Sequence, residues 1–421
     1  MRGNEKTGLQ AAALGDSLKA TGNVDVASKT FGPVKVSISA KTSVVTDLAT
    51  TDGVTRFSVK SDASVSASVA VKAGVASGKA SATDGVRANY EVSMPAAAAS
   101  QVDPASVNPF DPKSMPVGTT VTLSGEAYGG TALEASFKNL SASTKVESAA
   151  GVSVAVTRTG ENTVRVTAGP TGSQSLRDGV GVNVGLASVE LSRTDKLRDE
   201  TLKTAEFDLS TPEGKQGYED FVGAGVVPTQ NGPGVSGVAT VERKIYSSVS
   251  ELGGKFAGLG GSAQLGESGA TAVTTTRPDG TSTRVVDMHV NGGLPAHVTQ
   301  SFDASGAEQP GSREYAYQVK VENETAAVEL GLALGASGLK PGDTVTMTFD
   351  EKQLAAFRER VQQKAVDSFG GPAFPQSDSP DAFAAALVQD RTGTMETATR
   401  LFGLADGGQG FTPIDARVTV E

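Results

Sequence analysis

The sequence predicts a mainly β protein (β-rich α+β). It consists of long antiparallel meanders, each closing on a strand-to-helix junction, with a small helical cap at the C-terminus. Apolar and small polar residues alternate from Val34 to Ala40 and from Val65 to Val75. Such a period of two places one kind of residue on each face of a sheet. The sequence therefore predicts strands with one buried and one wet face, joined by tight turns.

The turns are marked by Asp-Gly pairs that separate β-patterned segments, at 52–53, 84–85, 178–179 and 279–280. Asp-Gly supplies the positive φ angles of a type I′ turn, which is typical of two-residue hairpins. The four pairs favour meanders over parallel strands joined by crossover helices.

The strand-to-helix junction is clearest from Leu202 to Val222. A predicted strand runs into Ser210-Thr211-Pro212-Glu213, where a hydroxyl can accept a hydrogen bond from the first free N–H groups of a helix. Pro212 stands where no N–H donor is needed, and Glu213 fits a capping box with Ser210. Related junctions recur at 344–361 and, in weaker form, at 119–137.

The totals exclude several classes of protein. A chain of 421 residues predicts two or three domains. Its formal charge of −10 argues against nucleic acid as a partner, because phosphate backbones are bound by Lys and Arg. With no cysteine, the chain has no disulfide, thiolate metal site or thiol nucleophile.

In chain order the pattern predicts five segments. They are a short helix at 8–20 with a long β-hairpin meander (1–94), a Pro/Ala-rich linker or surface connection (95–118), a second meander ending in a helix (119–223), a third meander ending in a helix (239–366), and a small helical cap with a final strand (367–421). Within the third meander, Thr271–Thr276 and Thr281–Val290 form the clearest predicted hairpin.

The candidate metal ligands are Asp287, His289 and His297. On a strand, Asp287 and His289 point to the same face, and His297 can return from the adjacent segment. Imidazole and carboxylate groups are ligands of several transition metals. The alternative interpretation, which the spacing favours, is that these residues are solvent-facing partners on a wet sheet.

Other chemistries have less support, and the sequence favours a non-enzymatic role without a cofactor. It contains neither a GxSxG elbow nor an HExxH motif. The 47 acidic residues keep a carboxylate-dependent hydrolase open as an alternative. The glycine-rich run at 258–263 matches a dinucleotide motif by letter, but no buried strand precedes it and no helix follows it.

The strands at 34–94 also suggest a membrane-inserting, pore-forming protein as an alternative, because amphipathic hairpins can place one face in lipid. The scarcity of interfacial aromatic residues, with no tryptophan and six tyrosines, makes insertion the less favoured hypothesis. No signal peptide or transmembrane helix is predicted. This is compatible with a delivered or secreted protein and with a cytoplasmic one.

The segments AEFDLSTPEG…YEDF (205–221) and VTTTRPDGTSTRVVD (273–287) resemble β-rich segments of large, uncharacterised bacterial proteins of the secreted or effector type. The resemblance implies a bacterial origin and a modular, delivered protein. The leading functional hypothesis is therefore a structural or binding module with a protein partner, which fits the carrier part of a secreted or injected protein.

Overall fold

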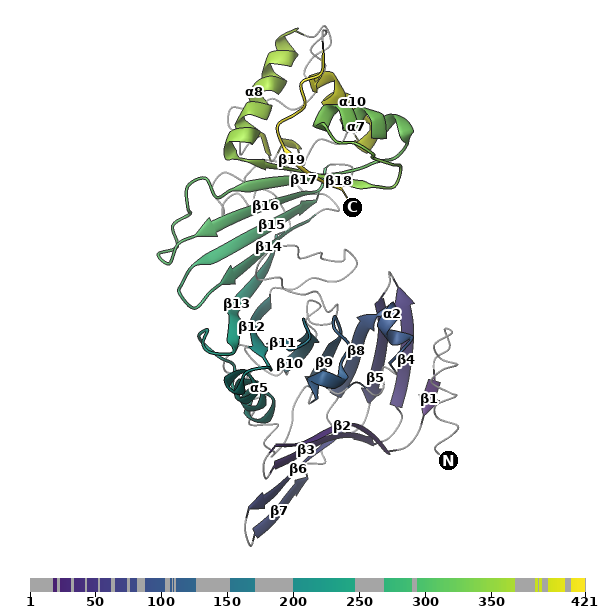
Figure 1. The fold of residues 1–421 in the computed structure, drawn as a ribbon, viewed down its shortest axis with the longest axis vertical. Helices are drawn as coiled ribbons and strands as arrows, with labels where there is room; N and C mark the ends of the chain where they lie inside the picture. Colours follow the sequence, from purple (N-terminus) through teal and green to yellow (C-terminus); the bar gives the residue numbers. More distant parts are fainter. Residues whose placement is uncertain are drawn as a thin grey trace. The chain divides into compact units, whose positions relative to one another are not determined.

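The computed structural model divides into two compact units, Met1–Val241 (unit 1) and Glu242–Glu421 (unit 2) (Figure 1). The structure describes residues 88–102, 107, 109, 111–125, 152–170, 200–246, 269–289, 294–367, 383–384, 386–387, 393–405 and 410–420. Between residues 18 and 81 it describes the backbone of seven strands.

Unit 1 is mainly β. Its elements are β1 (Leu18–Ala20), β2 (Asn23–Phe31), β3 (Val34–Lys41), β4 (Val44–Thr51), β5 (Val54–Ser61), β6 (Val65–Ala73), β7 (Ala76–Ser81), β8 (Ala88–Pro95), α2 (Ala96–Ala99), the 3-10 helix η2 (Pro112–Ser114), β9 (Thr120–Gly125), β10 (Val152–Arg158), β11 (Thr163–Pro170), β12 (Glu200–Asp208) and α5 (Pro212–Ala224). Strand β13 (Val235–Tyr246) begins in unit 1 and ends in unit 2.

Two antiparallel sheets form in unit 1. The larger has the order β1-β4-β5-β8-β9-β10-β11-β12-β13, and the smaller has the order β2-β3-β6-β7. Strand β4 ends with Thr51 opposite Val54 of β5, which leaves two residues between them, as an Asp-Gly hairpin requires. The turn itself lies outside the described residues, as do the pairs at 84–85 and 178–179.

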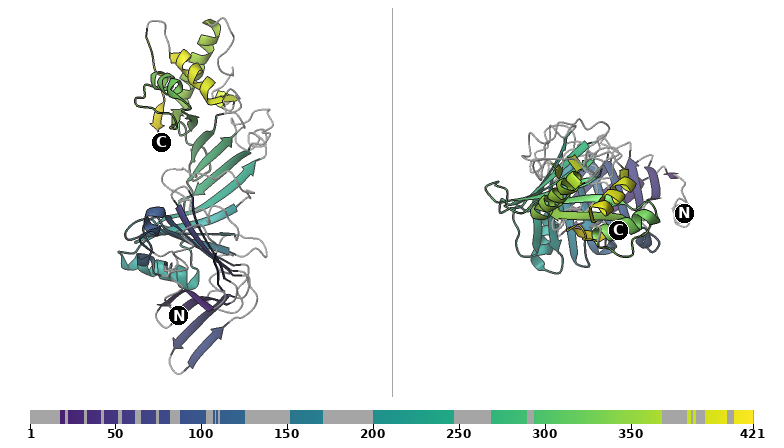
Figure 2. Two further views of the ribbon diagram at one scale, coloured as in Figure 1. Left: turned by 90° about the vertical axis from the view of Figure 1, so that its right-hand side faces the viewer. Right: turned by 90° about the horizontal axis from the view of Figure 1, so that it is seen from above.

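The core of unit 1 follows from strand alternation. Val164, Val166 and Ala168 of β11 are buried on one face, and Val166 lies opposite Val156 of β10. In the side view of Figure 2, the blue helix α2 and the teal helix α5 lie on the same side of this sheet. Helix α5 brings Tyr218 and Phe221 onto Phe207 of β12, with ring centroids 5.8 and 6.4 Å apart.

The junction between β12 and α5 confirms the predicted strand-to-helix design. The N-cap is Thr211, whose hydroxyl accepts a hydrogen bond from Gly214 N at 3.0 Å, and Pro212 is the first helical residue. Ser210 instead donates to the carboxylate of Asp208, which lowers the pKa of Asp208. The cap therefore lies one residue later than a Ser210–Glu213 capping box requires.

The Pro-rich segment 95–118 packs onto unit 1. Val107 and Met115 are buried in the core, and the buried hydroxyl of Tyr218 donates to the carbonyl of Pro109. Burial raises the pKa of Tyr218, and the nearby charge of Asp111 adds to this shift. Side-chain contacts thus hold the middle and the C-terminal part of this segment against the core.

Arg158, at the end of β10, fastens the same segment to the sheet. Its guanidinium donates to the carbonyls of Lys113 and Met115 in the Pro-rich segment. It also donates to the carbonyls of Gly160 at 3.1 Å and Glu161 at 2.8 Å in the turn after β10. One planar group with donors on three nitrogens therefore joins two pieces of backbone.

In its described part, unit 2 contains six further strands in an antiparallel arrangement, with helices on one face. Its elements are β14 (Gly269–Thr276), β15 (Ser282–His289), β16 (Ala296–Phe302), β17 (Glu314–Lys320), α7 (Glu324–Leu334), β18 (Thr344–Asp350), α8 (Glu351–Asp367), α10 (Gly393–Ala405) and β19 (Arg417–Val420). The strand order is β14-β15-β16-β17-β18-β19. The prediction of a mainly β fold with a small C-terminal helical element is confirmed.

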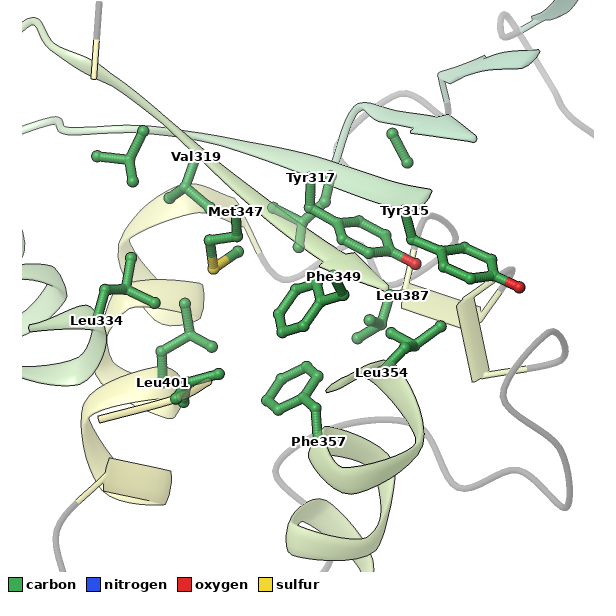
Figure 3. Close-up of a cluster of buried hydrophobic side chains, with 14 of the residues drawn as sticks. Tyr315, Tyr317, Val319, Leu334, Met347, Phe349, Leu354, Phe357, Leu387 and Leu401 are labelled. Atoms are coloured by element: carbon green, nitrogen blue, oxygen red, sulfur yellow. The ribbon is translucent and has the colours of Figure 1, made fainter. Parts of the chain in front are cut away.

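The core of unit 2 lies between the sheet and helices α7, α8 and α10. Phe349 of β18 stacks on Phe357 of α8, with ring centroids 5.2 Å apart (Figure 3). Tyr317 of β17 lies beside Phe349, and its hydroxyl donates to the carbonyl of Ala384 at 3.3 Å. Phe383 packs edge-on against Phe357. A cluster of four aromatic side chains thus fills the space between the sheet and helix α8, in a chain that is otherwise poor in aromatic residues.

Two helices of unit 2, α7 and α8, begin with side-chain caps. Asp350 and Gln353 cap α8 reciprocally, each side chain accepting from the other's backbone N–H. The sequence pattern does not predict α7, which Asn323 caps through Ala326 N at 2.9 Å. This helix carries apolar residues on its exposed side as well, at Val328 and Leu332, so it shows no clear one-sided periodicity.

The β14–β15 hairpin forms where the sequence predicts it, but its turn is not type I′. Gly280 N donates to Arg277 O at 3.0 Å, and Arg277 N donates to Thr281 O at 2.8 Å. Pro278 follows Arg277, and its ring fixes φ near −65°, whereas a type I′ turn needs a positive φ at that position. Gly280, with φ 84°, supplies the one left-handed residue.

A second correction concerns the N-terminus. The sequence predicts a helix at 8–20, whereas Leu18–Ala20 form strand β1, paired with β4. Residues before 18 lie outside the described part. The predicted strand at 180–191 and the weaker junction after β9 also lie outside it.

We predict that Gly214→Ala destabilises unit 1 by about 3 kcal/mol or more. A Cβ at Gly214 would lie 2.0 Å from the carbonyl oxygen of Asp208, so helix α5 would have to move away from the end of β12. The matched control is Gly403→Ala in α10, where nothing lies within 4 Å of the added Cβ. That change is expected to stabilise by about 0.5–1 kcal/mol. Urea unfolding followed by circular dichroism measures both, and equal effects would contradict the contact.

We predict that Arg158→Lys lowers the stability of unit 1 by roughly 2–4 kcal/mol, because an ammonium group cannot reach four carbonyls in two segments. The control is Arg400→Lys, which alters an exposed pair with Glu396 one helical turn away. That pair is worth about 0.3–0.5 kcal/mol. Hydrogen exchange should show faster exchange in η2 and β10 for the first variant only.

Candidate functional site

The predicted ligands lie on two neighbouring strands of unit 2. Asp287 and His289 belong to β15, and His297 belongs to β16 directly opposite Asp287 in the antiparallel register. The Nδ1 atom of His297 is in hydrogen-bond contact with Oδ1 of Asp287. The structure therefore brings Asp287 and His297 together, as strand alternation predicts. It describes only the backbone of His289.

This pair lies on the face of the sheet opposite the helices. The alternate residues Val286, Met288, Ala296 and Val298 are buried in the helix-covered core, so Asp287 and His297 project to the other side. We call this side the polar face of unit 2. On β16, β17 and β18 it carries partly exposed residues: His297, Thr299, Ser301, Ala316, Gln318, Thr346 and Thr348.

The Asp287 carboxylate is mostly buried although it lies on the polar face. Its side chain is 20% exposed, against 36% for His297. Oδ2 of Asp287 is inaccessible to solvent and has no hydrogen-bond partner among the described residues. Burying a carboxylate oxygen without a hydrogen-bond donor costs free energy of folding. Such oxygens are usually paired with a cation, a hydrogen-bond donor or a water molecule.

Small residues surround the pair. Thr271 of β14 lies opposite Asp287 on one side, and Ala316 of β17 lies opposite His297 on the other. Gly269 lies opposite His289. Within the described residues, no three His, Asp or Glu side chains gather into a metal-holding group. The side chain of His289 is not among those described, so the metal site stays a prediction.

A second polar cluster, which the sequence analysis does not identify, lies at the end of the β16–β17 hairpin. Glu308 accepts from Nε and Nη2 of Arg313, the latter at 2.7 Å, and from Nε2 of Gln300 at 3.2 Å. These partners lower the pKa of Glu308, the hydrogen bond from Arg313 most of all, and the positive charge of Arg284 adds to the effect.

Arg284 is the residue from which this cluster could have been predicted in the sequence. It lies opposite Gln300 in the register and places its guanidinium 4.5 Å from the ring centroid of Phe302. On β15, Arg284 lies on the same face as the buried residues Val286 and Met288, so a charged residue occupies a position on the core side of the strand. A charge there needs a polar network on the core side.

Two other carboxylates, those of Asp279 and Asp303, accept hydrogen bonds within turns. Asp279 accepts from the backbone and hydroxyl of Thr281, and Asp303 accepts in the same way from Ser305. These hydrogen bonds lower the pKa of both aspartates. The added Cβ of Gly280 would meet Ala304 at 3.2 Å, so the two hairpin ends touch. These groups fix loop geometry.

Comparison of the chain with protein-family models, characterised proteins and solved structures gives no match. Among the described helices, none has the length and apolar character needed to cross a membrane. For the strands at 34–81 only the backbone is described, so the membrane-inserting alternative stays a prediction.

We predict that Glu308→Gln destabilises unit 2 by about 1 kcal/mol near pH 6, because it weakens a charge-assisted pair in a partly solvated place. A carboxylate with a lowered folded-state pKa stabilises fully above its ordinary value near 4.3, and this contribution is lost as pH falls through the folded value. The difference between the two proteins should therefore shrink on going from pH 6 to about pH 3. Urea midpoints at both pH values measure this, and a difference that is constant with pH would contradict it.

Proposed function

We propose that this protein is a non-enzymatic structural and protein-binding module, the carrier part of a secreted or injected bacterial protein. The polar face of unit 2 is the observation that carries the proposal. Its partly exposed residues are small and hydrogen-bonding, including Thr299, Gln318, Thr346 and Thr348. Their hydroxyl and amide groups, on neighbouring strands, suit a flat contact with another folded protein.

The ionic and acidic groups named above support the same proposal. Arg158, Glu308 and Arg313 hold backbone or each other, and Asp279 and Asp303 fix turns. Arg165 and Glu206 pair across β11 and β12 at 3.1 Å. Such groups keep the strands in register and the loops ordered, which is what a carrier or scaffold requires.

The binding part is tested by blocking the polar face. We predict that Thr346→Arg with Thr348→Arg removes capture of a stoichiometric protein partner from an extract of the producing bacterium. Two adjacent guanidinium groups would obstruct a flat contact and bring unpaired charge to it. The control is Glu359→Arg with Gln363→Arg on the exposed side of α8, which should leave capture intact.

Capture that is equal for wild type and both variants, or no stoichiometric partner at all, would contradict the binding role. The delivered role is tested separately by following the protein in culture fractions. Accumulation in the medium supports delivery, and complete retention inside cells under conditions of active secretion contradicts it.

A further inference from the structure

We propose that the outer edge of β19 pairs with the same edge of a second copy of this chain, so that the sheet of unit 2 continues through a two-fold dimer. The inference is independent of the protein-binding role of the polar face. It rests on three observations: the backbone groups that the edge presents, the side chains that the pairing brings together, and the apolar surface beside the edge.

The first observation is that β19 has one paired side and one open side. Among the described residues it pairs only with β18, and it is the last strand in the order of the sheet. Val420 lies opposite Val345 on the core face, yet Val420 is 46% exposed whereas Val345 is fully buried. The apolar core therefore reaches the edge of the sheet, where no described strand covers its last valine.

The hydrogen-bond ladder shows which backbone groups the open side presents. The N–H of Val321, which follows β17 directly, donates to the carbonyl of Asp343 at 2.8 Å. Backbone groups alternate in direction along an antiparallel strand, so the odd-numbered residues of β18 face β17 and the even-numbered ones face β19. Thr419 lies opposite an even-numbered residue of β18, so its N–H and C=O point to β18. Those of Val418 and Val420 point to the open side, where a further strand can pair with them.

Charged side chains often block a sheet edge, but those at β19 are bound within unit 2. Nη2 of Arg417 donates to both carboxylate oxygens of Glu314 at 3.3 Å. Asp415, just before the strand, accepts from Gln353 at 2.9 Å. The strand itself, Arg-Val-Thr-Val, contains no proline and no second charge. Its edge is therefore open to another strand.

The second observation is that the edge is self-complementary. In an antiparallel pairing centred on Thr419, each Val418 lies opposite Val420 of the second copy, so the outward backbone groups of both valines form hydrogen-bonded pairs. The two Thr419 side chains lie opposite each other. The same register sets Arg417 opposite position 421, which is a glutamate in the sequence. β-Branched pairs, threonine pairs and opposite charges all stabilise directly opposed positions of a sheet.

The third observation is apolar surface on the helix beside the edge. Figures 1 and 2 show α7 next to β19, and Ile414, just before the strand, donates from its N–H to the carbonyl of Ala333 in α7 at 2.8 Å. Val328 and Leu332 of α7 are 60% and 41% exposed. The two-fold axis of an antiparallel edge pair is perpendicular to the sheet, so the helices of both copies stay on one face. Helix α7 then approaches α7 of the second copy, and apolar contact there adds to the strand pairing.

The test is sedimentation velocity of the untagged full-length protein over roughly a hundredfold range of concentration. A strand of four residues gives a small interface, so we expect a monomer–dimer equilibrium rather than a permanent dimer. Val420→Pro removes one outward N–H from each copy and leaves the β18–β19 ladder intact, so it should weaken dimerisation by roughly 10–100-fold. The matched control is Val420→Ile, which keeps the N–H and a β-branched apolar side chain and should dimerise as the wild type does.

A charge exchange separates loss of pairing from misfolding. Arg417→Glu should weaken dimerisation, because it sets two glutamates opposite each other, and Arg417→Glu combined with Glu421→Arg should restore it. All variants should give the circular dichroism spectrum of the wild type. The proposal is overturned by a wild type that stays monomeric at every concentration, by Val420→Pro dimerising as the wild type does, or by a double variant that recovers no dimer.

Discussion

One-sided burial along antiparallel strands is the constraint on which the rest of this structure depends. In unit 2, Tyr315 lies opposite Phe349, Tyr317 opposite Met347 and Val319 opposite Val345, all on the helix-covered face. A slip of one residue would bring Gln318 and Thr346 into that core and expose the aromatic residues. The same register sets Asp287 opposite His297. Core and polar face are therefore fixed together.

The capped junctions follow from this constraint. A strand that buries one face needs a cover, and the chain supplies it by turning into a helix directly after the strand. Thr211, Asn323 and Asp350 each accept a hydrogen bond at such a start. Because the connection is short, α5 and α8 contact the strands they leave, and Phe357 reaches Phe349. Gln353 extends one cap further by donating to Asp415 near the final strand.

Features encoded within a few residues could be predicted from the sequence. The mainly β fold, the β14–β15 hairpin and the starts of α5 and α8 depend on alternation, turn residues and caps that are adjacent in the chain. The predicted type I′ turn at Asp279-Gly280 is wrong because Pro278 fixes φ at a negative value where that turn needs a positive one. Helix α7 was missed because its apolar residues surround it. Local patterns thus predict elements better than they predict turn geometry.

Contacts between residues that are far apart in the chain could not be predicted from local sequence patterns. Arg158 binds carbonyl groups more than forty residues away, and carbonyl groups carry no sequence signature. Glu308 and Gln300 meet only after β16 and β17 adopt their register. At the candidate site, alternation put Asp287 and His289 on one face, while the hydrogen-bond contact with His297 and the buried carboxylate oxygen needed the structure.

The pairing of β14 to β18 has a consequence for how unit 2 acquires its structure. Each of these strands pairs with the next one in the chain, so their contacts have low sequence separation and should form quickly. Strand β19 returns from much further along the chain to pair with β18. A polypeptide leaving a ribosome or a narrow export channel with its N-terminus first would assemble this meander progressively. The last strand would then close the sheet as the final step.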